Sequence, residues 1–158
     1  MSKKGKVGFT VRLKDRVAVV TGAASGIGKQ IAIVFAKGGA RGAVSDIDLD
    51  GAKATAEEIK AGNGVAFAMK TNVALEEDIQ ALIDTTVGKY GTVDILVNNA
   101  GIMDDMEPAG DIEDRNWERI FTVNTTGVMR TTRKVLPIML EKGKGVIINV
   151  ASAGGLFG

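Results

Sequence analysis

Short apolar runs alternate with longer helical patterns along the whole chain, and this alternation restricts the fold more than any other feature. The runs are largely continuous rather than alternating in polarity, which is typical of strands buried on both faces of a sheet. Strict alternation of strand and helix predicts parallel strands joined by right-handed crossovers. The expected strands are Val17–Val20, Gly42–Asp46, Val65–Met69, Val93–Val97 and Val146–Val150.

Four helical patterns fill the connections between these strands. The first follows the glycine-rich residues 22–28, and the second is capped by Asp48 or Asp50. The third begins with three acidic residues from Glu76, which favour the positive end of the helix dipole. The last is predicted as one long helix over Asp114–Leu140, with Pro137 distorting its final turn.

The natural closure of these elements is a doubly wound α/β sheet with strand order 3-2-1-4-5. In such sheets ligands bind at the carboxyl ends of the strands where the order reverses, here between the first and fourth strands. We expect a single domain over residues 14–158, preceded by an N-terminal extension over residues 1–13.

Composition excludes several classes of function. The chain is 45% hydrophobic and 25% charged, which is typical of a globular domain. Its net charge of +1 gives no basic surface for nucleic acid. Cysteine and histidine are both absent, which excludes zinc sites built on them and any nucleophile activated by histidine. No apolar run reaches membrane-spanning length, and no secretory signal is recognisable. We expect a cytoplasmic protein with no metal, membrane or nucleic-acid partner.

A glycine-rich turn, Thr21-Gly22-Ala23-Ala24-Ser25-Gly26-Ile27-Gly28, joins the first strand to the first helix. Glycines there let the backbone turn sharply and let a pyrophosphate approach the helix N-terminus, where amide donors favour anions. The alternative is a generic turn with no ligand. Asp46 ends the second strand, eighteen residues after Gly28, where a carboxylate can accept both hydroxyls of an adenosine ribose. It would repel a 2′-phosphate, so NAD is preferred over NADP; the alternative is an acid that only caps the loop.

With Asn98-Asn99-Ala100-Gly101 after the fourth strand and Ile148-Asn149-Val150-Ala151-Ser152 at the fifth, the chain resembles the short-chain dehydrogenase/reductase family from Lys14 onward. The resemblance implies a Rossmann-type domain that binds NAD, a small-molecule alcohol or carbonyl substrate, hydride transfer between them, and a homo-oligomer. It assigns the phosphates to Gly22, Ser25, Gly26, Ile27 and Gly28, the adenine ribose to Asp46 beside Ile47, the adenine ring to Asn72 and Val73, and the nicotinamide side to Asn98, Ala100 and Gly101. Asn72 stands where the family usually has aspartate, so it keeps an acceptor oxygen but also presents a donor.

Two residues match catalytic positions of the family. Asn124 matches the asparagine that holds a water in a proton relay, and Ser152 matches the serine that polarises the substrate oxygen. The alternatives are a buried asparagine that bonds its own backbone and an ordinary loop serine.

The family's tyrosine and lysine pair would fall at positions 165 and 169, beyond Gly158. The only tyrosine, Tyr90, precedes the fourth strand and so lies at the amino end of the sheet, out of hydrogen-bond reach of the site. We therefore expect a Rossmann domain that lacks the last strands and helices of the family fold, with Val146–Val150 as an exposed edge, and little activity from this chain alone. The alternatives are a non-catalytic NAD-binding module and an inert fragment.

Overall fold

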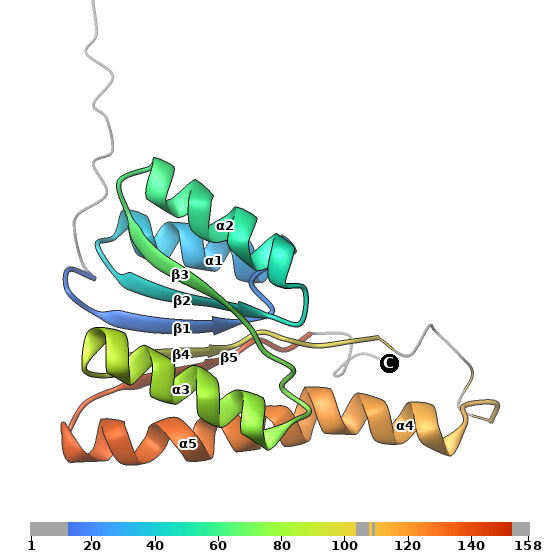
Figure 1. Cartoon of the computed structure of the whole chain (residues 1–158). Coiled ribbons are helices and arrows are strands. Elements are labelled where there is room, and N and C mark those ends of the chain that lie inside the picture. Colours follow the sequence, from blue (N-terminus) through green and yellow to red (C-terminus); the bar gives the residue numbers. More distant parts are fainter. Residues whose placement is uncertain (1–12, 104–107, 109, 153–158) are drawn as a thin grey trace, which may run out of the picture.

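A parallel five-stranded sheet with helices on both faces forms the molecule (Figure 1). The computed structural model describes residues 13–103, 108 and 110–152. The sheet has the order β3-β2-β1-β4-β5, and every neighbouring pair is parallel, as the alternation of strands and helices predicts. The strands are β1 (Val17–Thr21), β2 (Arg41–Asp46), β3 (Val65–Lys70), β4 (Ile95–Asn98) and β5 (Val146–Asn149).

One face of the sheet is covered by α1 (Gly26–Lys37) and α2 (Leu49–Ala61). Alternate side chains of the central strands, such as Val20, Val44 and Val97, are almost fully buried against these helices. Asp48 caps α2, because its side chain accepts hydrogen bonds from the amides of Asp50 and Gly51, and this confirms one of the two predicted caps.

The opposite face is covered by α3 (Glu76–Tyr90) and α5 (Gly127–Glu141). Val19, Leu96 and Val135 are fully buried in this second core. Helices therefore pack on both faces, which explains why the strand sequences are continuously apolar rather than alternating. The fold is the doubly wound, Rossmann-like arrangement expected from the sequence.

The prediction of one long helix over Asp114–Leu140 is wrong in one respect, because these residues do not form a single α-helix. It consists of α4 (Asp114–Phe121), a π-helical segment η1 (Thr122–Thr126) and α5. Helical structure continues through Pro137 to Glu141, so the irregular turn lies at η1 and not at the proline. Single π-helical turns insert one extra residue into a helix and are frequent at functional sites. Here the turn is centred on Asn124.

The outer strand β5 is a partly exposed edge, as the sequence predicts. Val146 is 53% exposed and Ile148 39% exposed. In contrast, every residue of β1 and β4 is buried. Of the proposed extension, residues 1–12 lie outside the described part of the chain, while Leu13 packs against the core beside α1. Among the described helices, none has the length and apolar character needed to cross a bilayer.

Candidate functional site

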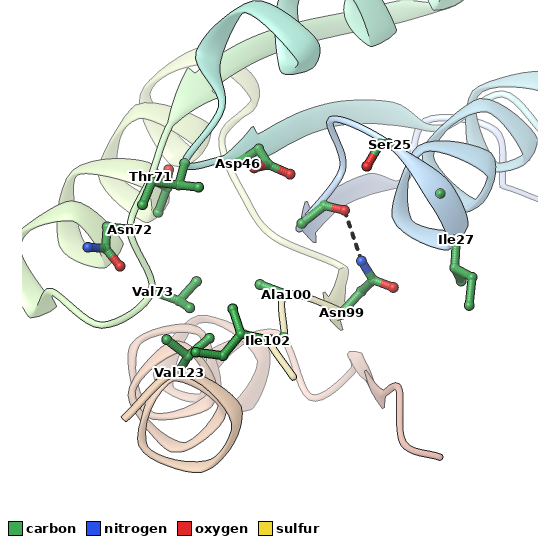
Figure 2. Close-up of a pocket in the computed structure, with 14 residues that line it drawn as sticks. Ser25, Ile27, Asp46, Thr71, Asn72, Val73, Asn99, Ala100, Ile102 and Val123 are labelled. Atoms are coloured by element: carbon green, nitrogen blue, oxygen red, sulfur yellow. Dashed lines mark hydrogen bonds between the residues drawn. The ribbon is translucent and has the colours of Figure 1, made fainter. Parts of the chain in front are cut away.

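A cleft of about 450 Å³ runs along the carboxyl ends of β3, β2, β1 and β4. Its volume lies within the range of roughly 300–1,000 Å³ that is usual for small-molecule sites. It lies at the reversal of strand order, where ligands of doubly wound sheets bind. The residues that line it are Gly22, Ser25, Gly26, Ile27, Asp46, Ile47, Thr71, Asn72, Val73, Asn99, Ala100, Gly101, Ile102 and Val123, most of which are labelled in Figure 2.

The glycine-rich turn forms the centre of this cleft. Gly22 adopts φ +65°, and a Cβ atom added to it would lie 2.8 Å from the Cα of Ala100, so both its conformation and its surroundings require glycine. The helix α1 begins at Gly26, and its first amides have no partner within the helix. α2 and α3 carry acidic residues in their first turns, but α1 carries none, so its positive end remains available to an anion.

Thr21 and Asn99 hold the turn against the end of β4. The Thr21 hydroxyl oxygen accepts hydrogen bonds from the amides of Asn99 and Ala100, both at 3.1 Å. The Asn99 side-chain amide donates to the carbonyl oxygens of Thr21 at 3.0 Å and Gly22 at 2.9 Å. Figure 2 shows this side chain reaching under the glycine turn. These bonds join the ends of β1 and β4 and fix the floor of the cleft.

Asp46 lies at the end of β2 on the other side of the glycine turn. Its Oδ2 accepts a hydrogen bond from the Ala24 amide at 2.9 Å, and its Oδ1 accepts one from the Asp48 amide at 3.0 Å. A carboxylate has about four acceptor sites, so two remain for a ligand. Among the described residues that line the cleft, none is lysine or arginine. The described lining of the cleft therefore offers no cation to this acid, although Lys70 is its register partner on β3 outside the lining.

The segment after β3 closes the far end of the cleft. Asn72 forms a turn in which its Oδ1 accepts a hydrogen bond from the Ala74 amide at 3.0 Å. The backbone amide of Asn72 donates to Asp78 of α3 at 2.8 Å. The adjacent Val73 is 8% exposed and lines the cleft. Because Oδ1 already holds this turn, only its second lone pair is available to a ligand.

Asn98 is buried beneath the cleft and connects three elements. Its Oδ1 accepts a hydrogen bond from the Thr131 hydroxyl of α5 at 2.6 Å. Its Nδ2 donates to Asn149 of β5 at 2.9 Å and to the Thr132 hydroxyl at 3.2 Å. Asn98 thus supports the sheet from below, while its neighbours Asn99 to Gly101 face the cleft.

Asn124 occupies the π-helical turn η1, and both halves of its amide are bonded to Ile102. Its Oδ1 accepts from the Ile102 amide and its Nδ2 donates to the Ile102 carbonyl, both at 2.9 Å. The alternative of a buried asparagine that bonds its own backbone is wrong, because Asn124 is exposed and bonds Ile102. These two bonds hold Ile102 at the border of the cleft and leave one acceptor lone pair and one N–H of the Asn124 amide. The adjacent Val123 lines the cleft.

The structure brings together most residues that the sequence suggested, but not all of them. Ten lie in the lining of one cleft, namely Gly22, Ser25, Gly26, Ile27, Asp46, Ile47, Asn72, Val73, Ala100 and Gly101. Gly28 and Asn98 are buried behind it. Ser152 is exposed, three residues beyond the end of β5, and is not part of the lining. Sequence reasoning missed Asn99, although its place directly after a buried strand end was a usable signal.

Tyr90 lies at the amino end of the sheet, as predicted. Its ring is 5.8 Å from that of Phe67 and 5.3 Å from the guanidinium of Arg41, the first residue of β2. Burial raises the pKa of the Tyr90 hydroxyl, and the nearby charges of Arg41 and Lys60 offset only part of this effect. Tyr90 is therefore remote from the cleft and is a poor proton donor at neutral pH.

A buried carboxylate, Asp94, ties the amino ends of β1 and β4 together. Burial alone would raise the pKa of Asp94, but hydrogen bonds from Lys142 and the Val17 amide, with the charge of Arg16, lower it below its usual range. The bond from the Val17 amide is 2.9 Å long and that from Lys142 is 2.7 Å. Asp94 is thus a structural anion, on the side of the sheet away from the cleft.

Comparison with known proteins agrees with this geometry. The family model for short chain dehydrogenases matches residues 16–158. The chain belongs to the short-chain dehydrogenase family. Within this family it is 39% identical to 3beta-hydroxysteroid dehydrogenase 2 of Eggerthella lenta over 91% of this chain, and 37% identical to cyclohexanol dehydrogenase of an Acinetobacter species over 93%. A crystal structure of hydroxysteroid dehydrogenase from Escherichia coli matches with a TM-score of 0.86 and 39% identity over 92% of the chain.

The short-chain dehydrogenases that match are longer than this chain. The alignments cover 56% of the Eggerthella protein and 59% of the Acinetobacter protein. The match to the Escherichia coli structure covers 61% of that chain.

Proposed function

We propose that residues 14–158 are the dinucleotide-binding domain of an NAD-dependent oxidoreductase that acts on a small-molecule alcohol or carbonyl compound. The hydrogen bond between the Ala24 amide and the Asp46 carboxylate carries this proposal. It places the only acid that lines the described cleft against the turn that leads to the N-terminus of α1. A dinucleotide needs both features side by side, one for its pyrophosphate and one for its ribose hydroxyls.

The residues of the cleft fit such a cofactor. The turn at Gly22 is too crowded for a side chain, and its amides together with those of α1 favour the pyrophosphate. The free acceptor sites of Asp46 suit ribose hydroxyls, and its charge disfavours a 2′-phosphate because no cation among the described lining residues offsets it. This supports NAD over NADP. Beyond Asp46, Asn72 and Val73 border the space for the adenine ring, and Ala100 and Gly101 border the nicotinamide side.

The catalytic part of the proposal rests on Asn124 and Ser152. A bound nicotinamide cofactor supplies the hydride acceptor or donor, and the protein supplies positioning and proton management. Ser152 follows β5 on the cofactor side of the sheet and would polarise the substrate oxygen. Asn124 holds Ile102 in place with one bond from each half of its amide and would also hold the water of a proton relay. The tyrosine and lysine of the family are expected at positions 165 and 169 of the whole protein.

The whole protein is proposed to form a homo-oligomer through α4 and α5. Five of the large apolar side chains that are exposed among the described residues lie on these two helices. On α4 the exposed side chains are Trp117 and Phe121, whose ring centroids are 4.4 Å apart. On α5 they are Met129, Leu136 and Leu140, and Leu140 is 69% exposed. Exposed apolar patches of this kind mark association surfaces.

A non-catalytic NAD-binding module is the second candidate. What supports it is that Tyr90, the one tyrosine within residues 1–158, lies at the amino end of the sheet, so this part of the protein offers no tyrosine to the cleft. Calorimetric titration with NAD, together with a dehydrogenase assay on a panel of alcohols and ketones, separates the two candidates. We expect saturable NAD binding, with turnover only when the segment expected to carry the tyrosine and lysine is present. Absence of NAD binding by the folded chain contradicts both candidates.

A further inference from the structure

The segment between β3 and α3, residues 71–75, closes the far end of the cleft. It is held by α5 as well as by the sheet. Arg130 of α5 donates a hydrogen bond from its guanidinium to the carbonyl oxygen of Ala74 at 2.6 Å. This bond is partly buried and joins residues 56 apart in the sequence. A charged donor makes a stronger bond than a neutral one, and partial burial shields it from water.

Close packing accompanies this bond one helical turn earlier. A Cβ atom added to Gly127 would lie 3.0 Å from the carbonyl oxygen of Val73 and 3.1 Å from its Cγ2. Only glycine therefore lets α5 approach Val73 so closely without a shift of the neighbour. Val73 lies between this helix surface on one side and the cleft on the other.

The remaining bonds of the segment fix only the side that faces the sheet and α3. The Thr71 amide donates to the Asp46 carbonyl at 2.8 Å, and the Asn72 amide donates to Asp78 at 2.8 Å. The Ala74 amide is used within the segment itself, on the Asn72 side chain. Among the hydrogen bonds of the described residues, the Arg130 bond is the one that ties the segment to the helix behind it.

We propose that Arg130, together with Gly127, is a positioning residue that holds Val73 and Asn72 in place for the base of the dinucleotide. This inference rests on the proposed function, because it concerns the adenosine half of the same cleft. Arg130 does not line the cleft, so its effect on the ligand passes through Ala74 and Val73. Without it, part of the binding free energy would be used to order the segment, which weakens affinity without removing a ligand contact.

The test compares Arg130→Met with Arg133→Met, which lies on the same helix and loses only exposed bonds to Glu76. Chemical-shift titrations measure the dissociation constants for NAD, for AMP as the adenosine half, and for nicotinamide mononucleotide as the other half. Arg130→Met is expected to weaken AMP and NAD by roughly tenfold, the scale of a lost hydrogen bond from a charged group, and to leave the mononucleotide unchanged. Arg130→Lys is expected to restore part of the loss, and Arg133→Met to behave as the wild type.

Two results would overturn the inference, and they differ from failure of the proposed function. If the wild type binds NAD and Arg130→Met binds AMP with wild-type affinity, Arg130 has no positioning role. If the affinities for both nucleotide halves weaken equally, the variant has disturbed the whole domain rather than the base segment.

If Arg130→Met does not fold, Gly127→Ala provides the same test, because its added methyl group pushes Val73 from the same side and should also weaken AMP binding selectively. Failure of the wild type to bind NAD is a failure of the proposed function instead.

Discussion

Replacement of Gly28 by alanine is expected to damage both the stability of the domain and its affinity for NAD. A Cβ atom at this position would overlap the carbonyl oxygen of Gly22 and the side-chain nitrogen of Asn99, and it would lie 2.9 Å from the Gly22 carbonyl carbon. These atoms are backbone or firmly bonded side chain, so they cannot move aside cheaply. The overlap with Gly22 therefore forces α1 to shift away from the turn, and the overlap with Asn99 breaks its 2.9 Å bond to Gly22.

The free-energy change can be worked out from these contacts. Overpacking costs about 1–3 kcal/mol. Loss of the Asn99 bond adds about 1 kcal/mol. The higher helix propensity of alanine stabilises the folded state by about 1 kcal/mol. The net destabilisation is about 1–3 kcal/mol, which lowers the melting temperature of a domain of this size by roughly 2–12 °C.

The assay is urea unfolding followed by circular dichroism, together with calorimetric titration of NAD. Gly88→Ala is the matched control, because Gly88 lies in α3 and a Cβ atom there would meet nothing within 4 Å. We expect Gly88→Ala to be as stable as the wild type or up to about 1 kcal/mol more stable. The reasoning is refuted if Gly28→Ala matches the wild type in both unfolding midpoint and NAD affinity.

Three further substitutions test other parts of the structure. Asp46→Ser removes the charge that faces a 2′-phosphate, so parallel titrations should show the NAD to NADP affinity ratio falling by about tenfold or more; an unchanged ratio contradicts the role of Asp46. Asn124→Ala removes both bonds to Ile102 and should lower the free energy of unfolding by about 1–2 kcal/mol, with faster hydrogen exchange at the Ile102 amide. Unchanged exchange would show that Asn124 does not hold Ile102 in place. Asp94→Asn should lower stability by about 1–3 kcal/mol at pH 7. Because the pKa of folded Asp94 is below its ordinary value of 3.8, its stabilisation is present above that value and is lost as pH falls through the folded pKa. The urea midpoints of variant and wild type should therefore converge as the pH is lowered beneath 3.8, and a constant difference would exclude this linkage.

The parts of the fold that the sequence predicts well are those set by local pattern. The buried strands appear as continuous apolar runs, and the glycine-rich turn and the cap at Asp48 carry their own local signals. The strand order 3-2-1-4-5 was expected as the usual order of a doubly wound sheet with right-handed crossovers. The predicted strand boundaries are less exact. A strand was expected from Val93, but β4 begins at Ile95, although Val93 and Asp94 are also buried.

The hydrogen bonds that join residues far apart in the sequence were not predictable. Asn99 supports the glycine turn through bonds to residues 77 and 78 positions away, and Arg130 meets Ala74 across 56 positions. Asn124, in the π-helical turn, is likewise bonded to Ile102, which is 22 residues earlier. Single-sequence patterns contain the types of these residues but not their partners. The cleft could therefore be located from the sequence, whereas the bonds that hold it in shape could not.

One dinucleotide is proposed to span the glycine turn and Asp46 at the carboxyl edge of the sheet, and an amide chemical-shift map of the chain titrated with NAD tests this proposal. We expect the largest shifts at Ser25 to Gly28, at Asp46 and at Val73, with little change around Asp94 and Tyr90 at the opposite edge. Shifts concentrated at that opposite edge, or confined to only one of the glycine turn and Asp46, would contradict it.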